Sequence, residues 1–148
     1  MTYQERQAVA SLFSAILISI FYFAYLLQRY PAASPYSADL FRFWGSSILV
    51  FIPVSIAANI VIQIVVTMAH SMSTKEKEPL LLDERDKLIE LRSTRNAIYV
   101  FAVGFLLAMG SLAIGMPPSV MFIVLIISGI LTEIVGALSQ LYWYRRGL

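Results

Sequence analysis

The sequence predicts an all-α, polytopic membrane protein with four transmembrane helices in an antiparallel bundle. Of its 148 residues, 59% are hydrophobic and only 14% are charged, whereas a soluble globular domain is about 45–50% apolar and about 25% charged. The charged side chains also leave three long uncharged stretches, at 7–28, 43–74 and 96–132. A helix needs about 20 apolar residues to cross about 30 Å of hydrocarbon, and these stretches have room for four such helices.

The first two stretches each fit one helix, at about 8–28 and about 43–70. The third is too long for one helix and is divided by Pro117 and Pro118, because two adjacent prolines cannot continue a helix interior. The remaining spans therefore fall at about 96–115 and 119–144, in a single domain of residues 1–148. The first span is expected to be an uncleaved helix, because its apolar stretch exceeds the usual 7–15 residues of a signal peptide.

Two local signals shape the second helix. Ser37 is placed to cap its start, with Asp39 in the positive first turn. Pro53 removes one backbone donor from the helix interior, so a bend is expected there. Both a static bend and a hinge are compatible with this proline, and we favour the static bend because proline is common in transmembrane helices.

The loop at 71–95 is the most distinctive charged segment. No breaker separates residues 83–95 from the third span, so we expect one long helix from 83 to 114 with its first turns in the cytosol. Its acidic residues come first and its arginines last, as the helix dipole favours. The segment is either a solvated extension that anchors the span or a docking surface for a soluble partner or a second copy. The candidate contact surface comprises Asp83, Glu84, Arg85, Asp86, Arg92 and Arg95.

The distribution of basic residues predicts the orientation. Six lie in the loop at 71–95 and three more at the termini, Arg6, Arg145 and Arg146, whereas the opposite side has only Arg29 and Arg42. The positive-inside rule then places both termini and this loop in the cytoplasm. The expected location is the inner (plasma) membrane of a bacterium.

One acidic residue lies deep inside a predicted span. A carboxyl at mid-membrane costs about 2.5–3.5 kcal/mol, so it normally faces protein or a water-filled cavity. At about 1.5 Å per residue, Glu133 and Asn59 lie at the same depth of about 15 Å, so the second and fourth helices are expected to meet there. The candidate intramembrane polar site comprises Glu133, Asn59, Gln63 and Gln140.

Two interpretations of this site stay open. A neutral Glu133 that exchanges a proton would make it a proton- or cation-handling site or a small-molecule site. Alternatively, the carboxyl only fixes packing through a hydrogen bond between helices, a contact worth about 0.6–2 kcal/mol. Ser128, Thr132 and Gly136 add small side chains beside it, which let helices approach closely.

Composition excludes several classes of function. The chain has no cysteine and one histidine, which excludes disulfides, thiolate catalysis and a multi-histidine metal site. A net charge of +2 gives no basic face for direct nucleic acid binding. No cofactor is expected, and the protein is not expected to be an enzyme because the one buried ionisable group lacks a set of partners.

Two segments of the second half resemble a known family. They are Asp83-Glu84-Arg85-Asp86 with the following 89–92, and the last helix, which contains Glu133 and ends at 140–147. They resemble a family of small uncharacterised prokaryotic membrane proteins with four spans. The family has no assigned activity, so the resemblance implies no functional residue. Its members are often encoded beside a small helix-turn-helix regulator, which implies a membrane-linked regulatory role.

The sequence therefore favours a non-enzymatic structural or regulatory membrane protein that acts through contacts. Its expected partners are the lipid bilayer, a second copy of the chain and a soluble cytoplasmic regulator. The alternative is a small transporter or channel subunit with a proton- or cation-linked site at Glu133.

Overall fold

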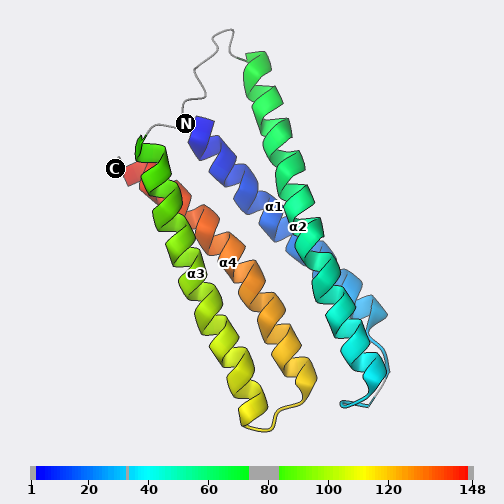
Figure 1. Cartoon of the computed structure of the whole chain (residues 1–148). Coiled ribbons are helices and arrows are strands. Elements are labelled where there is room, and N and C mark those ends of the chain that lie inside the picture. The colour runs from blue at the N-terminus through cyan, green and yellow to red at the C-terminus, as the bar shows by residue number, and fades with distance from the viewer. Residues whose placement is uncertain (1–2, 33, 74–83, 147–148) are drawn as a thin grey trace.

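The computed structural model describes residues 3–32, 34–73 and 84–146, and these form four long helices (Figure 1). They are α1 (Tyr3–Arg29), α2 (Ala38–Ser73), α3 (Glu84–Ala113) and α4 (Pro118–Arg146). All four are long and apolar enough to cross a membrane, and the described residues include no strand. The all-α fold with four apolar helices is therefore confirmed.

Helix α2 begins five residues before the predicted span, because its start is capped as expected. The Ser37 hydroxyl accepts a hydrogen bond from the Leu40 backbone N–H at 3.3 Å, and Asp39 lies in the first turn. A serine in this position satisfies one of the backbone donors left free at a helix start. The helix continues through Pro53 without interruption, so this proline does not end it.

Helix α3 is one unbroken helix from Glu84 to Ala113, as predicted except for Asp83, which lies outside the described residues. It ends in a glycine turn: Gly115 has a φ of 81°, its N–H bonds to the Leu112 carbonyl, and the Met116 N–H bonds to the Ser111 carbonyl. This pattern is a Schellman motif, in which glycine adopts the left-handed conformation without steric cost. Proline then opens α4 at its first position, where no backbone donor is needed.

The helices pack in the order α3, α4, α1, α2, with little direct contact between α2 and α4. Within the described residues no close backbone approach joins α2 to α3 or α1 to α3. The expected four-helix bundle is therefore not closed. Figure 1 shows both termini at one end of the molecule, here named the termini end, and both short connections at the other, the hairpin end.

An aromatic core holds α2 against its neighbours near the hairpin end. Trp44 of α2 stacks on Phe122 of α4 with ring centroids 5.8 Å apart, and the Tyr22 hydroxyl of α1 donates to the Ser47 carbonyl of α2. Tyr30 lies edge-on to Trp44. Aromatic pairs of this kind contribute about 0.5–1.5 kcal/mol beyond the area they bury. From this core towards the termini end, α2 and α4 diverge (Figure 1).

Candidate functional site

The first turns of α3 are fixed to the rest of the molecule through Asp86. Its carboxylate accepts a hydrogen bond from Gln4 Nε2 of α1 at 3.2 Å and another from the Tyr144 hydroxyl of α4. Asp86 is only 9% exposed. This residue was expected on a solvated contact surface, and instead it joins three helices at the termini end.

Arg92 also binds within the molecule. Its guanidinium lies 4.9 Å from the centroid of the Trp143 ring of α4. A cation over an indole face is attracted by the ring quadrupole, with a gain of about 0.5–1 kcal/mol at an exposed site. Asp86 and Arg92 therefore position the start of α3 and are not free to bind a partner.

The opposite side of the same turns is open. Of the expected contact residues, Glu84, Arg85 and Arg95 are exposed, and Asp83 lies outside the described residues. Two apolar side chains share this side, Leu88 at 55% and Leu91 at 68% exposure. Glu84, Leu88, Leu91 and Arg95 follow one another at spacings of four, three and four residues, which places them on one face of the helix. The two leucines were not identified from the sequence as contact residues, although this spacing could have revealed them.

The structure does not bring the intramembrane polar residues together. Glu133, Gln140 and Asn59 are half-buried, Gln63 is exposed, and no hydrogen bond joins Glu133 to Asn59 among the described residues. The cause is α1, whose start packs against α2 beyond Asn59: the Tyr3 hydroxyl lies 2.6 Å from Thr67 Oγ1. Helix α1 therefore holds α2 away from α4 at this depth, and the contact expected between Asn59 and Glu133 is not made.

Glu133 and Gln140 nevertheless share the face of α4 on which α2 packs at the hairpin end. They follow Phe122 by 11 and 18 residues, close to three and five full turns of 3.6 residues, and Phe122 contacts Phe41 and Trp44 of α2. Asn59 likewise follows Phe41 by 18 residues and lies on the face of α2 that meets α4 there. The polar side chains of α2 and α4 therefore lie on the same helix faces as the aromatic contact, but in the region where the two helices have separated.

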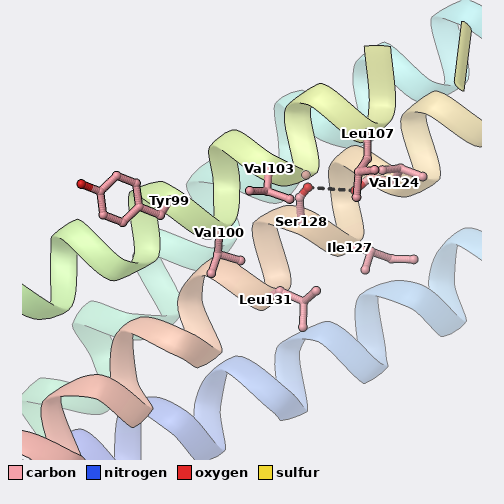
Figure 2. Close-up of a pocket in the computed structure, with 9 residues that line it drawn as sticks. Tyr99, Val100, Val103, Leu107, Val124, Ile127, Ser128 and Leu131 are labelled. Atoms are coloured by element: carbon pink, nitrogen blue, oxygen red, sulfur yellow. Dashed lines mark hydrogen bonds between the residues drawn. The ribbon is translucent and has the colours of Figure 1, made fainter. Parts of the chain in front are cut away.

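A seam of small residues joins α3 to α4. A Cβ atom added to Gly104 would lie 2.0 Å from Ser128 Oγ, and one added to Gly136 would lie 3.7 Å from the Ala97 Cβ. Figure 2 shows Ser128 facing α3, with its hydroxyl bonded to the Val124 carbonyl of its own helix. Small residues let helix backbones approach closely, so Ser128 and Gly136 serve this seam. The partner glycine, Gly104, was missed in the sequence.

Two apolar cavities flank α4 on the face opposite Glu133. The cavity in Figure 2, about 370 Å³, lies between α3 and α4. A second, about 510 Å³, lies between α1 and α4. Ile127 and Leu131 line both cavities, and neither cavity is lined by Glu133.

Within the described residues, no group of three or more His, Asp or Glu side chains is placed to hold a metal ion. Comparison with protein families, curated proteins and solved structures gives no match.

Proposed function

We propose that the chain is a multi-pass protein of the bacterial inner membrane that acts through contacts and not through catalysis. Its termini and the first turns of α3 face the cytoplasm, in line with the excess of basic residues at this end. These turns form the docking surface for a soluble partner. The proposal is supported above all by the exposure of Leu88 and Leu91 on a helical segment that the rest of the molecule holds in place.

The position of the two leucines argues for a protein partner. Leu88 and Leu91 precede the predicted start of the span by eight and five residues, which corresponds to about 12 Å and about 7 Å of helix beyond the hydrocarbon. A helix that only anchors a span in water would be polar on all sides there. An amphipathic helix of the partner could cover the leucines with its apolar side chains and pair with Arg95 through an acidic one.

The anchoring at Asp86 and Arg92 gives this surface a fixed geometry. Both side chains bind to α1 or α4, so the leucines are presented on a helix that is ordered before binding. A preordered surface reduces the entropic cost of association. The resemblance to proteins encoded beside helix-turn-helix regulators favours a soluble transcription regulator as the partner.

The transporter interpretation has less support. A transporter needs a water-filled path to its intramembrane acid, and neither of the two cavities described above is lined by Glu133. The contact interpretation needs only the exposed surface of α3.

The proposal is tested by measuring the binding of a purified soluble helix-turn-helix regulator from the same organism to the membrane-reconstituted full chain. Leu88→Glu and Leu91→Glu should each weaken binding at least tenfold, because each buries a charge in the contact. The matched control is Glu90→Ala, which changes an exposed residue on another side of the same helix. If the regulator binds wild-type and both leucine variants equally, or binds none of them, the docking surface is refuted.

A further inference from the structure

Two opposite sides of the molecule, one on either side of α4, differ in whether their polar side chains have hydrogen-bond partners. On the face with Ile127 and Leu131, the hydroxyls that line the cavities donate to carbonyls of their own helices, Ser128 to Val124 and Ser19 to Ala15. These groups are satisfied, so lipid chains can cover this face at no polar cost.

The opposite face carries the polar side chains that lack partners. Glu133, Gln140, Asn59 and Gln63 make no side-chain hydrogen bond among the described residues, and none of them is fully buried. A carboxyl and amides of Asn and Gln left facing hydrocarbon are costly. Something with hydrogen-bonding groups at the same depth must therefore cover this face.

We propose that a second copy of this chain covers it, so that the intramembrane polar site is completed only in a homodimer. Asn59 and Gln63 of one copy lie beside Glu133 and Gln140 of the other. The proposal rests on the membrane location proposed above, but it is independent of the docking surface on α3.

The depth of these polar residues and their hydrogen-bonding groups both favour a second copy of the chain as the cover of this face. Two copies related by a two-fold axis along the membrane normal keep every residue at its own depth, and Asn59 and Glu133 share a predicted depth of about 15 Å below the inner membrane surface. The amide groups of Asn59 and Gln63 supply donors that the Glu133 carboxyl accepts. The complementary groups within one chain are held apart by α1, so they remain available to a neighbour.

The shape of this face also suits a neighbouring helix. Gly129 follows Phe122 by seven residues and lies on the same side of α4 as Glu133, and a Cβ atom added to it would meet nothing within 4 Å. A glycine in open space on a helix surface permits close backbone approach. Helix α2 stands beside it with little of its apolar surface buried, including exposed Ile56, Ile60 and Ile64.

The absence of cysteine from the 148 residues allows a direct test with introduced cysteines. Ile56→Cys and Gly129→Cys are made in separate, differently tagged chains, which leaves Asn59 and Glu133 intact. The two purified proteins are mixed in vesicles of phosphatidylethanolamine and phosphatidylglycerol and oxidised. We expect a disulfide between the two tags, and a much lower yield when Leu131→Cys, on the opposite face, replaces Gly129→Cys.

A second measurement tests the role of the polar groups. Single-molecule photobleaching over a range of protein densities gives the dimer dissociation constant. Glu133→Leu should raise it by about 8- to 900-fold, because the two-fold dimer loses two symmetric interhelical hydrogen bonds of about 0.6–2 kcal/mol each. Glu133→Gln should leave it nearly unchanged, since the amide can still bond.

Three results would overturn the proposal: a disulfide yield no higher than that of the Leu131→Cys control, a monomer at every density, or equal dissociation constants for wild type and Glu133→Leu. Loss of regulator binding at Leu88 would leave all these measurements unaffected.

Discussion

Replacing Gly104 by alanine should separate α3 from α4 at the centre of their seam. The new Cβ would lie 2.0 Å from Ser128 Oγ and 2.3 Å from Ser128 Cβ, well inside contact distance. The Ser128 hydroxyl can rotate away, but its Cβ is fixed to the backbone, so the helices must move. Overpacking of this kind costs about 1–3 kcal/mol, against a gain of about 0.5–1 kcal/mol from replacing glycine by alanine in a helix.

The matched control is Gly110→Ala in the same helix, where an added Cβ meets nothing within 4 Å. This variant should be as stable as wild type or more stable by up to about 1 kcal/mol, since only the helix propensity changes. The free energy of unfolding can be measured by reversible detergent titration in bicelles. Gly104→Ala should lie below Gly110→Ala by about 1–3 kcal/mol.

Second-site variants identify the clashing atom. Ser128→Gly should rescue Gly104→Ala, because it removes both the hydroxyl and the Cβ. Ser128→Ala should not, because the Cβ at 2.3 Å remains. Equal stability of Gly104→Ala and Gly110→Ala, or equal rescue by both Ser128 variants, would show that α3 and α4 are not in this close contact.

Two further predictions concern the helix ends. Asp86→Ala removes the acceptor of Gln4 Nε2 and should lower the free energy of unfolding by about 1.5–3 kcal/mol, the value of a hydrogen bond to a charged group. It should also speed hydrogen exchange in the second turn of α1, where the amides bond within the helix, and unchanged exchange there would contradict the three-helix junction. Ser37→Ala removes the cap of α2 and should cost about 1 kcal/mol in the same detergent titration. Ser37→Asp serves as its control, since aspartate caps as well as serine and should restore the stability.

Features set by local chemistry were predictable from the sequence. The Ser37 cap, the break at Pro117 and Pro118 and the continuous α3 each depend on a few neighbouring residues, and all three appear in the structure. The sequence predicted where α3 ends but not the form of its last turn. The positive φ of Gly115 and the two backbone hydrogen bonds of the turn are seen only in the structure.

Contacts that depend on which helices lie next to one another could not be predicted from the sequence. Helix geometry predicted that Asn59 and Glu133 lie at one depth on facing helices, but it could not show that α1 packs along α2 and holds it away from α4. Asp86 looked solvated for the same reason, since its partner Gln4 lies 82 positions earlier in the chain. The role of Gly104 likewise depends on which residue faces it across the seam.

The tight seam between α3 and α4 has a mechanical consequence. With 30 residues, α3 is about 45 Å long, and the close approach at Gly104 couples it to α4, so the pair moves as one stiff rod. A partner that tilts the first turns by about 5° about one end would displace the glycine turn at the hairpin end by about 4 Å, given that length. A contact made on one side of the bilayer would thus reach the other side as a rigid displacement, without any rearrangement of side chains between.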